Sequence, residues 1–439
     1  MDILIKIAQL FLCFTILVGI HELGHFLMAR AFKIRVEKFY IFFDPWFSLF
    51  KFKRGDTEYG LGWLPLGGYV KIAGMIDESM DKEQMKQPVK PDEFRAKPAW
   101  QRLLVMVAGV MMNVLLAIVI YCAVCYTWGD SYFSNQDAKW GYNFNPTAHE
   151  MGFRDGDRFV SIDGEEIDNV MRVQNDLLIT DGGRRVVVER GGEPVTLDIP
   201  FESLLRMRQE KAYEDLFTLR LPFIVDSVSY TSAVEAGLQS GDEVVAIDDL
   251  RDADYPRYRD YLQKHKNDKV LLTVRRDGAL IDSLALPVDA EGRIGVTVTN
   301  PYSLRTQYYT FWESIPAGIH KAGKTISSYW DQLKLIVQPK TKMYEELGGF
   351  VAIGSIFPGS WDWHDFWLKT AFLSIILAVM NLLPIPGLDG GHALFTLWEI
   401  ITRRKPSEKF LEVAQYVGLM IILALLVLSL IHISEPTRH

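Results

Sequence analysis

Cysteine is scarce in this chain of 439 residues, and the positions of the few cysteines exclude two kinds of site. The three cysteines are Cys13, Cys122 and Cys125, and all of them lie inside long apolar stretches. None lies in the more polar segment 129–366, so no disulfide framework is expected there. Their spacing also differs from a zinc-binding cysteine pattern. We interpret them as small apolar residues packed within helices.

Charged residues are missing from four stretches, although they make up 23% of the chain as a whole. Three of these stretches are long enough to cross a bilayer as helices, because a span needs about 20 apolar residues. The first reaches that length when its flanking residues are added, and no small-residue cleavage site of a signal peptide follows it. The sequence therefore predicts an α-helical polytopic membrane protein. Its four transmembrane helices are expected at residues 3–28, 102–128, 367–389 and 411–432.

An excess of positive charge is also absent, since the net charge is −8. This value by itself says little about nucleic acid, and we expect no nucleic-acid partner because the basic residues set the membrane topology. Lys and Arg gather instead in segments 30–102 and 403–409, which follow the first and third predicted helices. Basic loops remain on the cytoplasmic side of a membrane. This pattern predicts that both termini and segment 129–366 lie outside.

The first apolar stretch ends in a motif with metal-binding spacing. Residues 21–25 read H-E-L-G-H, which matches H-E-x-x-H. Positions i and i+4 of a helix share a face, so His21 and His25 can bind one metal ion while Glu22 acts as a general base. Two histidines and a glutamate in a span are costly unless they pair, bind an ion or face water. The alternative is a pair of histidines at the membrane interface with the glutamate reaching water.

A third ligand is predicted near the end of the third apolar stretch. Residues 381–392 read N-L-L-P-I-P-G-L-D-G-G-H. The first and third helices run in the same direction, so Asp389 reaches the membrane depth of His21 and His25. A catalytic zinc site has three protein ligands and one open position. We therefore predict one Zn²⁺ per chain on these three residues, with His392 as the alternative third ligand.

Two further features lie within the predicted membrane part, 1–128. Residues 57–73 are rich in Gly, aromatic and β-branched residues and predict a β-hairpin with its turn near 65–68. The hairpin could enter the membrane if it lines a protected cavity, or form a small cytoplasmic sheet. Asn113 lies in the middle of the second helix and needs a hydrogen-bond partner, either in the active site or on a neighbouring helix.

The external segment contains an internal repeat. Residues 147–164 align with residues 232–249 at a constant offset, and both copies contain a G-x-x-x-G-D pattern. We predict two β-rich modules, at about 130–220 and 221–300, inserted between the second and third helices. The pattern resembles PDZ domains of bacterial envelope proteases, which bind extended peptide ends; a purely structural role is the alternative. A helical and Gly-rich connector is expected at 301–365, before the second part of the membrane core at 366–433.

Taken in this order, the motifs resemble the site-2 protease family of intramembrane zinc metalloproteases, in particular its bacterial sigma-E-regulating type. The resemblance covers residues 1 to about 431. It implies zinc bound by His21, His25 and Asp389, and Glu22 as the catalytic base. It also implies a membrane-re-entrant β-hairpin. Substrate-binding residues are then expected at Tyr59, Gly60, Leu61, Gly62, Trp63, Leu64, Pro65, Asn113 and Asn381.

The same resemblance implies a location and partners. The protein is expected in the bacterial inner membrane, with its termini and PDZ modules in the periplasm and its active site near the cytoplasmic side. Its partners would be the lipid bilayer, single-span membrane substrates such as anti-sigma factor stubs or signal-peptide remnants, and an upstream site-1 protease.

Two other classes of function remain open from the residues alone. A membrane-anchored PDZ scaffold would need neither metal nor Glu22. A metal transporter would need polar residues along several spans, and the sequence offers few, mainly Asn113 and Asn381. Zinc analysis combined with a cleavage assay separates these possibilities.

Overall fold

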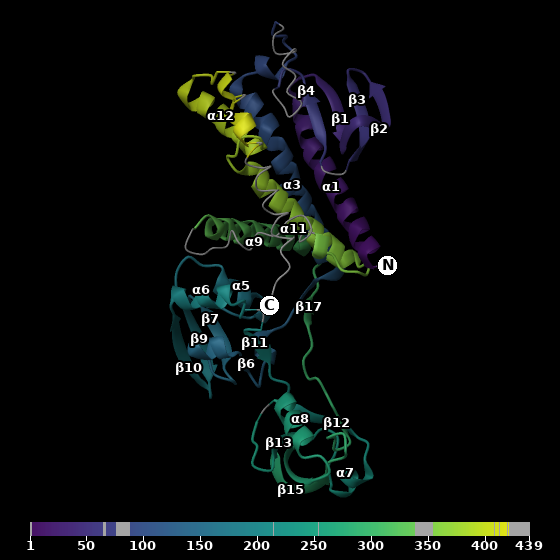
Figure 1. Cartoon of the computed structure of the whole chain (residues 1–439), viewed down its shortest axis with the longest axis vertical. Coiled ribbons are helices and arrows are strands. Elements are labelled where there is room, and N and C mark those ends of the chain that lie inside the picture. Colours follow the sequence, from purple (N-terminus) through teal and green to yellow (C-terminus); the bar gives the residue numbers. More distant parts are fainter. Residues whose placement is uncertain are drawn as a thin grey trace. The chain divides into compact units, whose positions relative to one another are not determined.

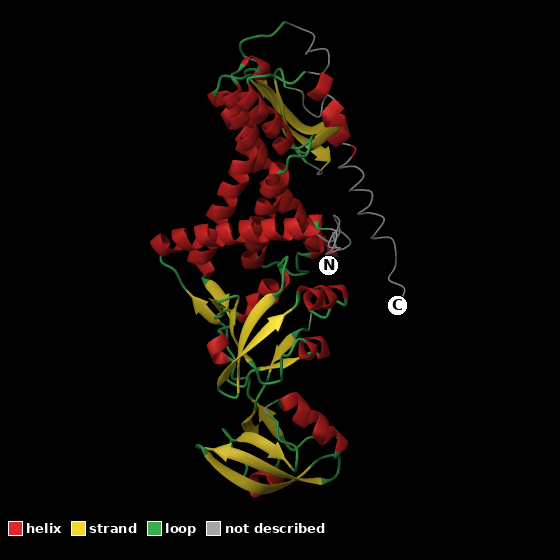
Figure 2. Ribbon diagram, turned by 90° about the vertical axis from the view of Figure 1, so that its left-hand side faces the viewer, coloured by secondary structure: helices red, strands yellow, loops and turns green. Residues whose placement is uncertain are grey.

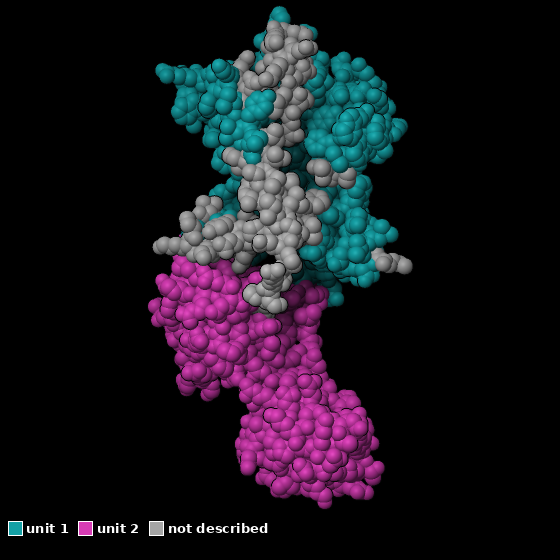
Figure 3. Space-filling model, viewed as in Figure 1, with its two compact units in different colours: residues 1–130, 308–439 teal, residues 131–307 magenta. Residues whose placement is uncertain are grey.

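The chain folds into two compact units. The computed structural model describes residues 2–64, 67–75, 88–213, 215–252, 254–338, 354–407 and 409–420 except 412 and 419. The first unit combines residues 1–130 with 308–439, and the second contains residues 131–307 (Figure 3). The first unit contains the apolar helices and the second is built mainly from β-strands. Helix α9 (Phe311–Val337), which lies within the predicted connector, therefore belongs to the first unit.

Three helices of the described residues are long and apolar enough to cross a membrane: α1 (Asp2–Ala31), α3 (Ala99–Trp128) and α11 (Trp363–Leu382). They pack side by side in the first unit (Figure 1). A Cβ atom on Gly24 of α1 would lie 2.5 Å from the Ala108 carbonyl oxygen of α3. Glycine therefore lets these two backbones approach closely. Most of the fourth predicted helix, 411–432, lies outside the described residues.

The third predicted helix ends earlier than expected. Helix α11 stops at Leu382 because Pro384 and Pro386 follow, and proline neither donates a backbone hydrogen bond nor tolerates a helical residue before it. A short turn leads to α12 (Asp389–Thr402). The prediction that 367–389 is one helix is therefore wrong. Asp389 lies in the first turn of α12, where the helix dipole favours a carboxylate.

A four-stranded sheet follows α1. Its strands are β1 (Val36–Ile41), β2 (Phe43–Arg54), β3 (Thr57–Leu64) and β4 (Tyr69–Ile72). The order is β2-β3-β1-β4, with β1 parallel to β3 and antiparallel to β4. The predicted hairpin at 57–73 is therefore wrong in its pairing, because β1 lies between β3 and β4. The hairpin instead joins β2 to β3 through a turn at Gly55, whose φ of +63° suits glycine.

Helix α9 (Phe311–Val337) lies across α3 and α11 (Figures 1 and 2). It begins with a capping box between Thr310 and Glu313, which satisfies backbone N–H groups at its start. One face packs on the bundle, and the other exposes Trp312 and Trp330. Residues 339–353, which include much of the predicted Gly-rich segment, lie outside the described residues. A short helix, η1 (Phe94–Ala96), precedes α3.

The second unit contains two β-rich halves. The first half comprises η2 (Asn135–Asp137), β6 (Tyr142–Phe144), α4 (Pro146–Glu150), β7 (Arg158–Ile162), β8 (Glu165–Glu166), η3 (Val170–Arg172), α5 (Val173–Leu178), β9 (Arg184–Arg190), β10 (Glu193–Ile199), α6 (Phe201–Gln209) and β11 (Phe217–Leu219). The second half comprises β12 (Phe223–Val228), α7 (Thr231–Glu235), β13 (Glu243–Ile247), α8 (Tyr255–Lys264), β14 (Lys269–Arg276), β15 (Ala279–Pro287) and β16 (Val296–Val298). Strands β5 (Asp130–Tyr132) and β17 (Arg305–Gln307) pair where the chain enters and leaves.

The repeated sequence forms the same local structure in both halves. Strands β10-β9-β7 in the first half correspond to β15-β14-β13 in the second, and each half has its own buried core. Asp157 pairs with Arg190 at 2.7 Å, and Asp242 pairs with Arg276 at 2.6 Å. Each arginine also donates to the carbonyl of the repeated glycine, Gly152 or Gly237. The G-x-x-x-G-D pattern is thus explained by a structural ion pair.

Candidate metal centre

The two motif histidines lie on one face of α1 and are buried against α3. His21 is 8% exposed and His25 is 6% exposed. The helix α3 offers Gly109 at their level, where a Cβ atom would come within 2.7 Å of His21 Cε1 and closer still to His25 Nε2. The absence of a side chain at this position therefore lets both imidazoles pack on the backbone of α3.

The turn between α11 and α12 brings Asp389 to the histidines. Its Oδ2 atom lies 3.1 Å from His21 Nε2 and 3.3 Å from His25 Nε2, and the two Nε2 atoms are 3.3 Å apart. Ligands about 2.0–2.2 Å from a tetrahedral zinc ion are about 3.3–3.6 Å from each other. The three atoms thus form a triangle of nearly the size that zinc requires.

The Asp389 carboxylate provides a second test of this fit. Its Oδ2 atom is buried and, within the part of the chain that the structure describes, accepts no hydrogen bond of normal geometry. A buried charged oxygen without a partner is costly, and a cation removes that cost. Among the described residues, His21, His25 and Asp389 form the one cluster of His, Cys, Asp or Glu suited to a metal ion. His392, the alternative ligand, is not part of it.

The outer nitrogen atoms of the imidazoles face α3. His25 Nδ1 lies 2.8 Å from the Val105 carbonyl oxygen, and His21 Nδ1 lies 3.4 Å from Asn113 Nδ2. On the other side of the centre, Asn381 Nδ2 of α11 lies 3.4 Å from His21 Nε2. The structure therefore brings both predicted asparagines to the histidines. The roles predicted for them in substrate binding stay predictions.

Glu22 lies beside strand β4. The side chain is half-buried, and a Cβ atom on Gly68, just before β4, would lie 3.3 Å from Glu22 Cγ. The backbone of Val70 in β4 also interacts with the Glu22 carboxyl group. Strand β4 is at the edge of its sheet. Glu22 therefore lies next to an edge strand of the sheet.

Residues 59–64 of the predicted substrate-binding segment lie in β3, inside the sheet and not at its edge. Tyr59, Gly60 and Leu61 pair with β1 on one side and with β2 on the other, so their backbone edges are already used. Gly62, Trp63 and Leu64 form the end of β3, and Pro65 lies outside the described residues. A substrate strand cannot add to the paired part of β3. The sequence did not reveal this because it does not specify strand order.

Other residues that contact the histidines, or that link α12 to α3, were not identified from the sequence. Val105 and Gly109 precede Asn113 by eight and four residues, a helical spacing that could have identified them. Arg102 of α3 and Glu399 of α12 form an ion pair at 2.5 Å, which links the helix carrying Asp389 to α3. No local signal connects Arg102 with Glu399.

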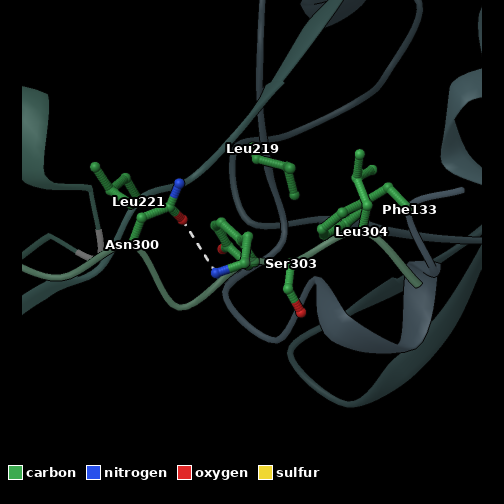
Figure 4. Close-up of a pocket in the computed structure, with 7 residues that line it drawn as sticks. Phe133, Leu219, Leu221, Asn300, Ser303 and Leu304 are labelled. Carbon is green, nitrogen blue, oxygen red and sulfur yellow. Dashed lines mark hydrogen bonds between the residues drawn. The ribbon is translucent and has the colours of Figure 1, made fainter. Parts of the chain in front are cut away.

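A separate pocket of about 330 Å³ lies within the second unit (Figure 4). Its walls are mostly apolar, and the Tyr302 backbone N–H donates to Asn300 Oδ1 at 3.0 Å beside it. The lining residues are Phe133, Leu219, Leu221, Asn300, Tyr302, Ser303 and Leu304. They include no carboxylate, histidine or thiol that would provide acid–base or metal chemistry.

Comparison with known proteins gives consistent matches over the whole chain. The family described as Peptidase family M50 matches residues 9–425. A Clostridium perfringens protein with the provisional name zinc metalloprotease is 29% identical over 421 residues, which are 95% of each chain. A Vibrio cholerae protein of the same provisional name is 29% identical over 98% of each chain. The Regulator of sigma E protease of Haemophilus influenzae is 27% identical over 98% of each chain.

Proposed function

Because this chain belongs to peptidase family M50, the site-2 protease family, and is a metalloendopeptidase, we propose that it cleaves membrane proteins within the bilayer with one zinc ion per chain. The observation that carries the proposal is the triangle of His21, His25 and Asp389 atoms, with sides of 3.1–3.3 Å, beside Glu22. The three apolar helices in the same unit support a membrane location.

Each residue of the centre has a proposed role. His21, His25 and Asp389 hold the zinc ion, which when bound supplies a Lewis acid that polarises the scissile carbonyl and acidifies water. Glu22 takes the proton of the attacking water and delivers it to the leaving amine. The Asn381 carboxamide, next to His21, donates a hydrogen bond that holds the substrate backbone.

The sheet next to α1 is proposed to hold the substrate as a strand. A transmembrane substrate is helical, and its scissile carbonyl is hydrogen-bonded until the segment unwinds. A strand added to a sheet edge replaces the broken backbone hydrogen bonds. The edge of β4 beside Glu22 suits this purpose, whereas the paired part of β3 does not. Val70→Pro should therefore slow cleavage of a helical substrate more than cleavage of one already unwound by glycines. Equal slowing of both would indicate a purely structural sheet.

The physiological substrates are proposed from the relatives and the modules. One relative, from Haemophilus influenzae, is named Regulator of sigma E protease. We propose that this chain cleaves anti-sigma factor stubs, with signal-peptide remnants as a second class of substrate. The two modules would act as PDZ domains that admit only substrates trimmed by a site-1 protease. From the distribution of basic residues we propose that the termini and both modules lie in the periplasm and that the metal centre lies near the cytoplasmic side of the inner membrane.

The test uses the full-length protein in detergent and a model substrate with a single transmembrane segment. Glu22→Gln should abolish cleavage while one zinc per chain remains bound. Glu37→Gln on β1 makes the same change outside the metal centre and should cleave normally. Cleavage by the Glu22 variant would overturn the general-base role. Full activity after rigorous removal of zinc would overturn the proposal and favour a scaffold with a contaminating protease.

A substrate with a folded outer domain tests the role of the modules. The wild-type protein should cleave the trimmed substrate faster than the untrimmed one. Removal of residues 131–307 should reduce that difference. An unchanged preference would assign size selection to another part of the chain.

A further inference from the structure

We propose that Asn113 is a positioning residue that holds His21 in the tautomer able to bind the metal ion. This inference rests on the proposed zinc site and adds a residue outside the ligand set. Asn113 was expected among the substrate-binding residues, whereas in the structure its carboxamide lies against His21.

The distances to Asp389 indicate which nitrogen of each imidazole binds the metal. Both Nε2 atoms face Asp389 Oδ2, at 3.1 and 3.3 Å, so Nε2 is the ligand atom in His21 and in His25. A neutral imidazole carries one proton, and a nitrogen that binds a metal must leave its lone pair free. The proton is therefore on Nδ1 in both histidines, and each Nδ1–H needs an acceptor.

His25 has an acceptor supplied by the backbone. Its Nδ1 lies 2.8 Å from the Val105 carbonyl oxygen, which accepts the hydrogen bond and fixes the tautomer. His21 has no carbonyl within hydrogen-bonding distance among the contacts of the described residues. Its Nδ1 faces the Asn113 carboxamide, which is fully buried.

The state of the carboxamide shows what the site requires. Asn113 Nδ2 lies 3.4 Å from His21 Nδ1, while Asn113 Oδ1 is buried and has no hydrogen-bond partner among the described residues. With Nδ2 as donor, His21 would carry its proton on Nε2 and could not bind a metal there. A half-turn of the carboxamide exchanges its two ends and places Oδ1 where it accepts from His21 Nδ1–H. That orientation gives the oxygen a partner and leaves Nε2 free for the metal.

The position of Asn113 is fixed by its neighbours. Ser374 Oγ of α11 donates to the Asn113 backbone carbonyl at 2.8 Å, which holds α3 and α11 together at this level. Val105, Gly109 and Asn113 follow one another at intervals of four residues, so they share one face of α3. That face supplies an acceptor for His25, space for both rings and an acceptor for His21. Helix α3 thus orients the ligands that α1 carries.

The test measures zinc affinity of the full-length protein in detergent by competition with a chelator, with Zn²⁺ as the probe. Asn113→Leu removes the acceptor at similar volume, and loss of such a partner typically weakens metal binding about 10–100-fold. Asn113→Asp retains an acceptor oxygen and should keep the affinity within about threefold of wild type. Gln9→Leu is the matched control. The carboxamide of Gln9 in α1 is also fully buried, and its oxygen likewise has no partner among the described residues. Its nitrogen donates to the Pro358 carbonyl oxygen, and within the described ranges neither atom is hydrogen-bonded to a histidine. It should leave zinc affinity unchanged.

The outcomes separate this inference from the proposed function. Wild-type protein that binds no zinc would overturn both. Wild-type affinity in Asn113→Leu would overturn only the role of Asn113, and so would an Asp variant that binds as weakly as the Leu variant. If Asn113→Leu does not fold, Asn113→Ser replaces it. The serine side chain keeps an oxygen but is too short to bring that oxygen to His21. A higher KM of Asn113→Leu at unchanged zinc affinity would assign Asn113 to substrate binding instead.

Discussion

Replacing Gly109 with alanine places a methyl group between α3 and the two imidazoles of the metal centre. The new Cβ would lie 2.7 Å from His21 Cε1, and contact between side chains ordinarily begins at about 3.4 Å. The Cβ would therefore be about 0.7 Å too close to His21 Cε1, and it would be closer still to His25 Nε2. The rings cannot move freely, because Asp389 Oδ2 already lies 3.1 Å from His21 Nε2 and 3.3 Å from His25 Nε2. Both ligand atoms must therefore move by an appreciable fraction of an ångström.

A displacement of about 1 Å at an active site typically costs about 100-fold in rate, or about 2.7 kcal/mol of transition-state stabilisation. Because the expected movement is somewhat smaller than 1 Å, we expect Gly109→Ala to lose about 10- to 100-fold in kcat/KM on a single-span substrate and to bind zinc more weakly. Gly323→Ala in α9 is the matched control, since its Cβ would meet no atom within 4 Å. Alanine is a better helix former than glycine, so the control should be as stable as wild type or more so. Activity of Gly109→Ala within threefold of wild type would refute the packing of the imidazoles on α3.

Asp389→Asn should weaken zinc binding at least tenfold, because a neutral amide is a poorer ligand than a carboxylate; unchanged affinity would remove Asp389 from the ligand set. Arg102→Leu leaves Glu399 without its ion-pair partner and should also weaken zinc binding by loosening α12, with recovery in the double variant that also carries Glu399→Leu. Asp242→Asn should destabilise the second module by about 2 kcal/mol near pH 7, because it leaves Arg276 without its buried partner; hydrogen exchange of β14 amides in the full chain measures this loss. Burial raises the pKa of Asp242, but hydrogen bonds from Arg276 and the backbone outweigh burial and bring the pKa below its ordinary value. The stabilising effect is therefore complete above the unfolded-state pKa of about 3.9 and is lost as the pH falls below it, so wild type and variant should converge in acid.

The sequence by itself determined the features that depend on local spacing. The i, i+4 period of a helix places His21 and His25 on one face wherever that helix lies. Apolar length predicted α1 and α3 nearly to their ends, because the bilayer sets the number of residues needed. The repeat predicted two similar β-rich halves, and the ion pairs of Asp157 and Asp242 explain why the repeated pattern contains an aspartate.

Tertiary structure decided everything that depends on contacts between distant segments. Strand order is set by which edges meet during packing, so local alternation could not show that β1 separates β3 from β4. The prolines after Leu382 predicted a break, but only the packing of α12 on α3 placed Asp389 at 3.1 Å from His21. The partner of Asn113 was likewise undetermined, because a polar residue within a span must find a hydrogen bond and its sequence neighbours do not say where. The candidate ligand types were therefore readable from the chain, whereas their convergence and the contact between His21 and Asn113 required the folded bundle.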